Sequence, residues 1–351
     1  MSIIVSIFIF SVIVIIHEFG HFIAAKKNNV MVEEFAIGMG PKIFSAKKGE
    51  TIYSLRLFPI GGFCQMLGDD YTNSSERSFG NKSVLQKIII VSAGAAMNFL
   101  LAFIIFILLV AFSGTSTPRV NKVFDGYPAK EIGILPGDYI RSVNGNKINI
   151  AQDLSFYISD SGDKEIELEI KRDGKLLNFL ITPVKSEDGR YILGFEKDIV
   201  SGLFSKIDGV RKINLVEIFL NAFFMILFYI KLTFIGLFRL LSFKLSISEM
   251  SGPIGIVKII GDTYNLSIAA GFIYALESIA NFMAILSANI GIFNLLPIPA
   301  LDGGRLFFLL IEAFRRKPIN VEKEGFVHLV GFIILMIFAV IIAVSDIIKI
   351  I

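Results

Sequence analysis

The sequence predicts a polytopic α-helical membrane protein of about four transmembrane helices, with an inserted β-rich domain and an amphipathic helix in the membrane interface. Of its 351 residues, 54% are hydrophobic and 19% are charged, whereas soluble domains have roughly 45–50% apolar and about 25% charged residues. The mean hydropathy is +0.69. Because the apolar residues form runs that can cross a hydrocarbon core of about 30 Å, much of the chain is expected to lie in a lipid bilayer.

Four apolar runs are predicted to span the bilayer, at residues 3–25, 88–112, 274–296 and 326–344. Each is long enough at about 1.5 Å per helical residue. Basic residues are concentrated in the loop between the first two runs and in the loop between the last two. Loops rich in Lys and Arg stay in the cytoplasm, so both ends of the chain are expected outside it.

Residues 113–199 have the composition of a small soluble domain, which this topology places outside the cytoplasm. Asn-Gly at 144–145 and Asp-Gly at 173–174 are typical hairpin turns, and acidic and apolar residues alternate at 165–170. The sequence PGDYIRSVNG at 136–145 is similar to the Gly-Asp-x-Ile-x-x-Val-Asn-Gly core of PDZ domains. Another small β-rich domain is the alternative.

Residues 213–243 are also apolar and long enough to span. At about 100° per helical residue, the polar side chains of this segment fall within an arc of roughly 100°. They are Asn214, Glu217, Asn221, Lys231, Arg239 and Ser242. A one-sided polar stripe is typical of a helix that lies in the membrane interface.

Four regions follow from these predictions. Residues 1–112 hold the first two transmembrane helices and a cytoplasmic, membrane-associated β-loop. Residues 113–199 form the extracytoplasmic domain, and residues 200–267 form a linker with the interfacial helix. Residues 268–351 hold the last two transmembrane helices.

The charge balance and the cysteine count exclude two classes of protein. The net charge of +3 comes from 34 Lys and Arg against 31 Asp and Glu, which is too small and too mixed for a nucleic-acid-binding protein. Cys64 is the single cysteine, so the fold cannot depend on an internal disulfide.

The motif HEFGH at residues 17–21 is the strongest chemical signal. On a helix it places His17 and His21 on one face, one turn apart, beside the carboxylate of Glu18. This pattern is typical of a catalytic Zn2+ site, in which the two imidazoles bind the metal and the glutamate is the general base for the bound water. A chance pentapeptide is the alternative, but each unpaired charge in an apolar span costs about 3 kcal/mol or more.

Two histidines leave a tetrahedral zinc short of one protein ligand, and Asp302 is the candidate. It stands in NLLPIPALDGG at residues 294–304, where Pro297 and Pro299 must interrupt the helix. Irregular backbone at membrane depth is tolerated only when it is buried in protein or lines a wet cavity. The alternative is an aspartate that caps a helix.

The predicted topology also bears on Asp302. With the amino terminus outside, His17 and His21 lie in the inner half of the first span. If residues 213–243 crossed the bilayer, the next span would run outward and leave Asp302 at the outer surface. If they lie in the interface, that span runs inward and Asp302 reaches the depth of the histidines.

These motifs resemble those of the site-2 protease family of intramembrane zinc metalloproteases. Residues 94–98 (GAAMN) look like the family's Gly-x-x-x-Asn, and residues 251–256 (SGPIGI) like its Ser-Gly-Pro-Ile-x-Ile. The resemblance is closest to the regulator of sigma-E protease (RseP) subgroup. It implies that His17, His21 and Asp302 bind zinc and that Glu18 is catalytic.

Two departures from that subgroup are visible. Only one PDZ domain fits the length between the second span and the later ones, where the best-known members carry two. Arg305 follows Asp-Gly-Gly where those members usually have histidine. The first departure puts substrate gating by a tandem pair of PDZ domains in doubt, whereas the second is expected not to touch catalysis.

Five further residues have weaker signals for substrate binding. Gly61 and Gly62 lie in a segment, 51–68, that resembles the family's membrane-associated β-structure, whose edge could hold an unwound substrate; a plain cytoplasmic hairpin is the alternative. Asn289 and Asn294 could clamp substrate or donate to an oxyanion, but hydrogen bonding between helices is as good an explanation. Gly194, in ILGF at 192–195, could belong to a loop that binds a peptide carboxylate, or to an ordinary core strand.

The resulting hypothesis is a zinc endopeptidase of the bacterial cytoplasmic (inner) membrane that cleaves single-span membrane proteins within or near the transmembrane segment. The resemblance implies substrates such as anti-sigma factors, possible action on remnant signal peptides, and an upstream site-1-type protease that makes the first cut. The lipid bilayer is a partner and nucleic acid is not. The alternative is a catalytically silent membrane PDZ adaptor that binds exported carboxyl termini.

Overall fold

The computed structural model describes residues 2–68, 75–205, 209–244, 250–317 and 319–350. Its contacts form two compact units. One, the membrane unit, combines the residues up to Ile105 with those from Tyr229 onward, and the other is Phe106–Phe228.

Among the described residues, five helices are long and apolar enough to cross a membrane. They are α1 (Ser2–Lys27), α2 (Val84–Ser113), α5 (Leu215–Leu241), α7 (Phe272–Phe293) and α9 (Val321–Ile350). Four coincide with the predicted spans, and α5 coincides with the predicted interfacial helix. The predicted fold class of a polytopic helical membrane protein with an inserted β-rich domain is confirmed, whereas the membrane placement of α5 stays a prediction.

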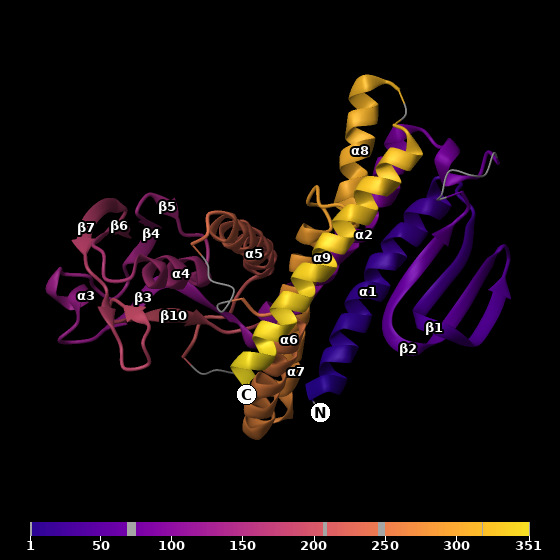
Figure 1. Cartoon of the computed structure of the whole chain (residues 1–351). Helices are drawn as coiled ribbons and strands as arrows, with labels where there is room; N and C mark the ends of the chain where they lie inside the picture. Colours follow the sequence, from indigo (N-terminus) through magenta and orange to yellow (C-terminus); the bar gives the residue numbers. More distant parts are fainter. Residues whose placement is uncertain (1, 69–74, 206–208, 245–249, 318, 351) are drawn as a thin grey trace. The chain divides into compact units, whose positions relative to one another are not determined.

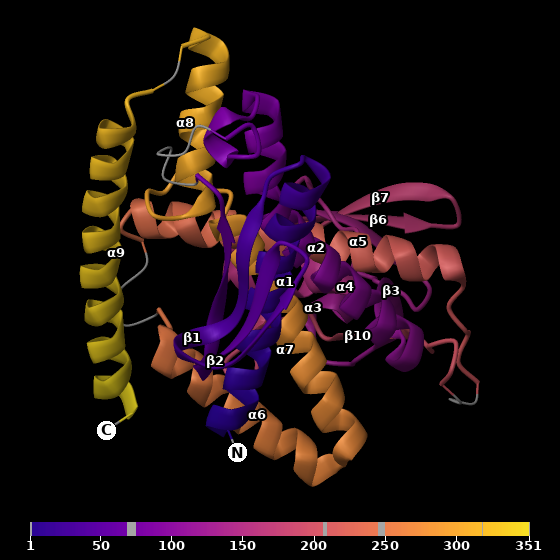
Figure 2. The same cartoon turned by 90° about the vertical axis from the view of Figure 1, so that its right-hand side faces the viewer.

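Within the membrane unit, α1 packs against α6 (Pro253–Ala270) and α7, and α6 packs against α7 and α9 (Figures 1 and 2). The buried residues of α1 recur every three or four positions, as expected for one face of a helix. They include Ile9, Ile13, His17, His21 and Ala24. The motif that predicts the metal site therefore lies on the buried face of α1.

Two glycines bring α1 and α2 close together. A Cβ on Gly20 would lie 2.8 Å from the carbonyl carbon of Ala93 and 2.8 Å from Cγ of Met97. A Cβ on Gly94 would lie 2.7 Å from Nε2 of His17. Small residues at such crossings let helix backbones approach in membranes, so α2 reaches the histidine rings with its backbone.

Helix α6 was not expected from the sequence, which placed residues 200–267 in a linker and an interfacial helix. It begins after Gly252, with Pro253 in the first turn, a position where the missing N–H of proline costs nothing. The carboxylate of Asp346, in α9, accepts hydrogen bonds from the backbone N–H groups of Gly252 (3.1 Å) and Gly255 (2.8 Å). The SGPIGI segment is thus a helix start whose free N–H groups are satisfied by an acidic side chain of another helix.

The predicted β-loop is a pair of long strands, β1 (Val32–Lys48) and β2 (Thr51–Met66). Each strand bends, so that Ile37 pairs with both Gly62 and Leu55. Each strand therefore contributes two segments to a small sheet of four adjacent segments. Residues 62–66 lie at one edge of this sheet. Glycines with positive φ occur along both strands, including Gly38 (84°) and Gly61 (84°), a conformation that costs glycine little.

A buried acid holds the bend of this β-pair. Glu34 is 6% exposed and forms ion pairs with Lys42 (2.8 Å) and Arg56 (2.7 Å), while Ser54 donates a hydrogen bond to it (2.5 Å). Burial raises the pKa of Glu34, but the hydrogen bonds from Lys42, Ser54 and Arg56 outweigh it and lower the pKa to about 2.

The β-rich domain of residues 106–228, called the PDZ-type domain below, contains an antiparallel sheet with the strand order β10-β3-β4-β6-β7 and with β5 beside β4. Its strands are β3 (Thr115–Val123), β4 (Tyr139–Val143), β5 (Asn146–Lys147), β6 (Ile166–Arg172), β7 (Lys175–Ile181) and β10 (Phe195–Val200). The short strands β8 (Val184–Lys185) and β9 (Tyr191–Ile192) pair separately, and the helices are α3 (Pro128–Glu131) and α4 (Ala151–Ser161).

Both predicted hairpin turns are confirmed. Asn144 and Gly145 join β4 to β5, with φ values of 49° and 73°, and Asp173 and Gly174 join β6 to β7, with φ values of 49° and 83°. Two successive positive φ angles are the signature of the turn that Asn-Gly and Asp-Gly favour. The core under the sheet includes Leu154 of α4 and alternate residues of the strands.

Candidate metal centre

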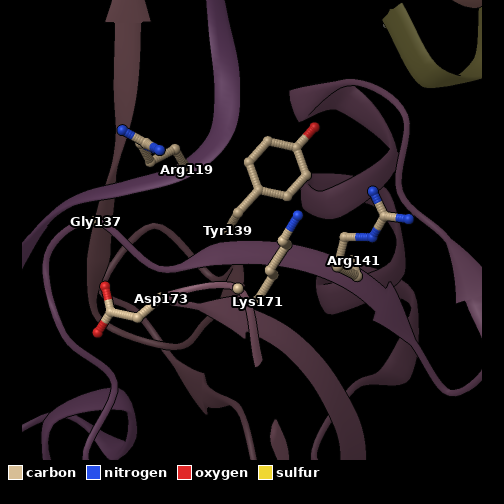
Figure 3. Close-up of a pocket in the computed structure, with 7 residues that line it drawn as sticks. Arg119, Gly137, Tyr139, Arg141, Lys171 and Asp173 are labelled. Carbon is tan, nitrogen blue, oxygen red and sulfur yellow. The ribbon is translucent and has the colours of Figure 1, made fainter. Parts of the chain in front are cut away.

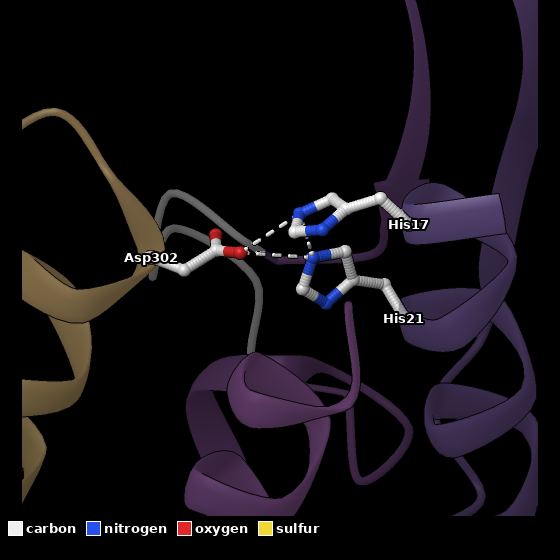
Figure 4. A group of neighbouring side chains, drawn as sticks. All are labelled: His17, His21 and Asp302. Carbon is white, nitrogen blue, oxygen red and sulfur yellow. Dashed lines mark hydrogen bonds and ion pairs between the residues drawn. The ribbon is translucent and has the colours of Figure 1, made fainter. Parts of the chain in front are cut away.

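Three predicted ligands, from helices far apart in the sequence, come together (Figure 4). Nε2 of His17 lies 3.0 Å from Oδ2 of Asp302, and Nε2 of His21 lies 3.2 Å from the same oxygen. The two Nε2 atoms are 3.2 Å apart. Both histidines are buried, and these three residues are the group that could hold a metal ion among the described residues.

The donor set fits a zinc ion. A tetrahedron with zinc–ligand bonds of about 2.0–2.1 Å has edges of about 3.3–3.4 Å, close to the separations of 3.0–3.2 Å between the three ligand atoms. Two imidazole nitrogens and one carboxylate oxygen leave the fourth position of a tetrahedron for water, as in catalytic zinc sites.

Each histidine has a second partner on its other ring nitrogen. Nδ1–H of His21 donates to the backbone carbonyl of Ile90 (2.9 Å). Nδ1 of His17 lies 3.3 Å from the side-chain amide of Asn98. Such contacts orient a metal-binding imidazole and fix its proton on the nitrogen that does not bind the metal.

Asn98 is completely buried in α2. Its Oδ1 has no hydrogen-bond partner among the described residues, while its Nδ2 faces His17. A His17 that binds metal through Nε2 carries its proton on Nδ1 and therefore needs an acceptor. With the side-chain amide turned so that Oδ1 faces His17, Nδ1–H of His17 donates to Oδ1 of Asn98. Both groups then have a hydrogen-bond partner.

Asp302 is the first residue of α8 (Asp302–Arg315), and a tight bend precedes it. Ala300 has a φ of 71°, and its N–H donates to Nδ1 of His328 (2.8 Å). A Cβ on Gly331 would meet the ring of Pro299, so α9 packs closely against the bend. The two prolines thus interrupt the helix as predicted, and α9 holds the bend that delivers Asp302.

Glu18 lies on α1 between the two histidines in sequence and beside strand β2. The backbone of Cys64 hydrogen-bonds to its carboxylate, and a Cβ on Gly62 would lie 3.8 Å from Cγ of Glu18. The edge segment of the β-pair therefore passes directly beside the candidate base.

The other predicted site residues have different surroundings. The side-chain oxygen of Asn289 accepts a hydrogen bond from Thr233 of α5 (2.9 Å), which favours the helix–helix explanation for this residue. Asn294 is the residue that ends α7. Gly194 lies in the PDZ-type domain with a φ of 86°. Arg305 stacks on the ring of Phe79, 4.4 Å from its centroid.

Sequence reasoning missed three contributors to the site: Asn98 as the partner of His17, the carbonyl of Ile90, and His328 as the support of the bend. Asn98 did carry a signal, because it ends the GAAMN motif. A backbone carbonyl carries none. His328 lies outside the ligand group and acts on the bend through its hydrogen bond with Ala300.

A separate hollow of about 440 Å³ lies on the PDZ-type domain. Figure 3 shows Arg119, Arg141 and Lys171 around Tyr139 at this hollow, on three neighbouring strands. These residues alternate with core residues such as Ile140 and Ile170, so the hollow is on the sheet face opposite the core. Its lining is cationic and differs in chemistry from the metal centre.

Residues 5–338 match the family model described as Peptidase family M50. The match covers most of the chain, so the chain belongs to this family, and the predicted site-2 protease resemblance is confirmed. It is a zinc metalloprotease of bacterial membranes.

Particular relatives agree with this class. A Clostridium acetobutylicum protein named as a zinc metalloprotease is 37% identical over 347 residues, covering 99% of this chain and 97% of its own. The regulator of sigma-W protease RasP of Bacillus subtilis is 32% identical, covering 99% of this chain and 98% of its own. The second alignment spans 441 positions, so RasP carries segments that this chain of 351 residues lacks.

A solved structure is similar to part of this chain. The PDZ domain of an SdrC-like protein from Listeria monocytogenes is 21% identical, covers 23% of this chain and 87% of its own, and has a TM-score of 0.22.

Proposed function

We propose that this metalloprotease cleaves single-span membrane proteins within or near the transmembrane segment, with His17, His21 and Asp302 as zinc ligands and Glu18 as the general base. The observation that carries the proposal is the convergence of three ligand atoms within 3.0–3.2 Å of one another, on the buried face of a helix that also bears Glu18.

Zinc in this position would lower the pKa of a bound water and polarise the carbonyl of the scissile bond. With the metal bound, Glu18 would act as the general base, accepting a proton and passing it to the nitrogen of the leaving amine. Asn98 and Ile90 keep the imidazoles aimed at the ligand position. Helix α8 supplies the third ligand, Asp302.

The substrate must be unwound before it can react, because a helix shields its carbonyls. The edge of β2 at Gly61 and Gly62 is suited to hold an extended segment by strand addition, since this edge passes beside Glu18. Asn294, the residue that ends α7, is proposed to bind substrate backbone next to the bend that precedes Asp302. Asn289 is the weaker candidate for substrate binding, because its side-chain oxygen already accepts a hydrogen bond from Thr233.

Substitutions at the site test this assignment. Glu18→Gln should abolish cleavage while zinc stays near one per chain, because the base is not a ligand. His17→Ala and Asp302→Ala should lower both zinc content and cleavage. Wild-type turnover by the Glu18 variant would remove Glu18 as the base, and full zinc retention by the Asp302 variant would remove that residue from the ligand set.

The proposed topology has both chain ends and the PDZ-type domain outside the cytoplasm, with α5 in the interface. Two contacts support it. Asp346, near the carboxyl end of α9, binds the start of α6, and a Cβ on Gly261 of α6 would meet Ser2. Helix α6 thus begins on the side of the membrane unit where both chain ends lie.

Thiol labelling tests the topology. Cysteines placed at Asn214 and at Ser246, which lies outside the described residues, should both react with a membrane-impermeant reagent added from outside, in a Cys64→Ser background. Labelling at one end alone would mean that α5 crosses the bilayer.

The natural substrates are proposed to be membrane-bound regulators of the anti-sigma type, cut after a first cleavage by a site-1-type protease, and remnant signal peptides. The name of RasP, a regulator of sigma-W protease, supports this class. Single-span proteins that accumulate uncut in cells expressing Glu18→Gln, and not in wild-type cells, would identify the substrates. An unchanged set of membrane proteins would contradict the proposal.

The PDZ-type domain is proposed to bind the free carboxyl terminus of a polypeptide at the loop that contains Gly194. This assigns recognition to the extracytoplasmic domain and chemistry to the membrane unit.

A further inference from the structure

A second hollow of the PDZ-type domain, about 220 Å³ in volume, lies between helix α4 and the segment that leads into β10. We call it the α4–β10 groove. One part of its lining is apolar, from Leu154, Ile158, Leu193 and Phe195, and another part is polar and cationic, from Ser155, Arg190 and Lys197. A ligand for this groove must therefore combine an apolar group with a negative one.

Strand β10 has one open edge. In the sheet its neighbour is β3. The carbonyls of Leu193 and Gly194 accept hydrogen bonds from the N–H groups of Ala129 and Phe124, both at 2.9 Å. Because the N–H of a trans peptide points opposite to its carbonyl, the N–H groups of Gly194 and Phe195 point away from these partners, toward the open edge.

The turn at Gly194 is fixed by its surroundings. Its φ is 86°, and a Cβ at this position would collide with the side chain of Tyr127. Only glycine fits, so the two outward N–H groups are held in place before any ligand arrives. A substitution at Gly194 would disturb the fold as well as binding, which makes it a poor test of recognition.

Lys197 stands two residues after Phe195 on β10, so both side chains face α4. Its Nζ donates to Oγ of Ser155 across the groove at 2.6 Å. Burial, with a smaller effect of the nearby Arg190, lowers the pKa of Lys197. Among the described residues, Lys197 belongs to no ion pair, whereas Arg190 is paired with Asp188.

We propose that the α4–β10 groove selects polypeptide carboxyl termini that carry an acidic side chain two residues before the terminal residue, and that Lys197 reads this acid. The inference rests on the carboxyl-terminus binding proposed above. The terminal carboxylate accepts from the outward N–H groups, and the terminal side chain enters the apolar part of the groove. An added antiparallel strand then places the side chain two positions earlier on the same side, beside Lys197.

Peptide binding to the full-length protein in nanodiscs tests this selection. Three fluorescent heptapeptides would be compared, each ending in valine: one with Glu two residues before the end, one with Gln there, and the Glu peptide with an amidated terminus. We expect the Glu peptide to bind about tenfold more tightly than the Gln peptide, the size of one charge-assisted contact in a half-buried site. The amidated peptide should lose binding.

Two variants sharpen the test. Lys197→Met should remove the preference for Glu while the Gln peptide still binds, and Lys197→Glu should reverse it in favour of a peptide with Lys at that position. Lys171→Glu is the matched control, because it makes the same charge change at the hollow on the opposite sheet face and should leave the preference intact.

Each outcome decides the question. Equal binding of the Glu and Gln peptides, loss of the preference in the Lys171 variant, or failure of every free-terminus peptide to bind would overturn the inference. Zinc content and Glu18-dependent cleavage are measured on the same wild-type preparation. Failure of the proposed protease function would appear in those measurements, and failure of the acid selection would appear in the peptide series alone.

Discussion

Gly94 of α2 leaves the space in which the two imidazoles meet. A Cβ added there would lie 2.7 Å from both Cε1 and Nε2 of His17, and it would also collide with Nε2 of His21. Since Cβ atoms are essentially never found closer than 3.0 Å to another heavy atom, the His17 ring would have to retreat by at least about 0.3 Å, more than the roughly 0.2 Å that metal–ligand distances tolerate. Gly94→Ala therefore displaces both ligand atoms at once.

We expect Gly94→Ala to weaken zinc binding at least about tenfold, or about 1.4 kcal/mol, and to lower cleavage in parallel. Metal analysis after dialysis against a graded series of chelator concentrations measures the affinity directly. Gly236→Ala is the matched control, because no neighbouring atom lies within 4 Å of a Cβ built at this helical glycine. It should retain zinc and gain up to about 1 kcal/mol of helix stability. Wild-type zinc affinity in Gly94→Ala would refute the placement of the metal beside α2.

Three further outcomes are expected. Asn98→Leu should lower zinc affinity about 10- to 100-fold, because it leaves Nδ1–H of His17 without an acceptor. Ser287→Ala removes only a hydrogen bond to the Asn98 backbone and should leave zinc affinity unchanged. Equal losses of affinity in the two variants, measured by chelator titration, would contradict this expectation. Asp346→Ala should destabilise the membrane unit by about 2 kcal/mol or more in thermal unfolding, because the buried charged acceptor of two N–H groups is lost. Lys349→Met should destabilise it less. The lowered pKa of Glu34 adds stability that is complete above its ordinary pKa of 4.5 and is lost as the pH falls toward about 2. In Glu34→Gln, the midpoint of thermal unfolding should therefore depend less on pH across that range than it does in the wild type. The same pH dependence in both proteins would refute this expectation.

The chemistry of the site could be predicted where residue type alone was informative. Two histidines and an acid inside an apolar run are costly unless they are used, so His17, Glu18 and His21 stood out. Pro297 and Pro299 marked the bend before Asp302, because proline cannot continue a helix. The hairpin turns at 144–145 and 173–174 were equally visible, because Asn-Gly and Asp-Gly favour positive φ.

Other features depend on tertiary contacts that no local pattern reveals. Helix α6 is stabilised at its start by Asp346, whose own position in α9 gave no hint of a distant partner. Residues of β1 pair with two separate parts of β2 because both strands bend. The alternation of apolar and polar residues along a strand does not specify where it bends. No local pattern marks Lys197, because the groove that it lines is completed by α4.

The bond between Asp346 and Gly252 joins residues 94 positions apart, and this separation matters during synthesis. When α6, α7 and the bend with Asp302 have left the ribosome, the amides at the start of α6 still have no acceptor, and they gain it only once nearly all of α9 has followed. Every proposed zinc ligand is therefore translated before the contact that anchors the helices around it. A nascent chain would carry the groups for proteolysis without a rigid frame to align them, and hydrolytic competence would come with the last turns of the final helix.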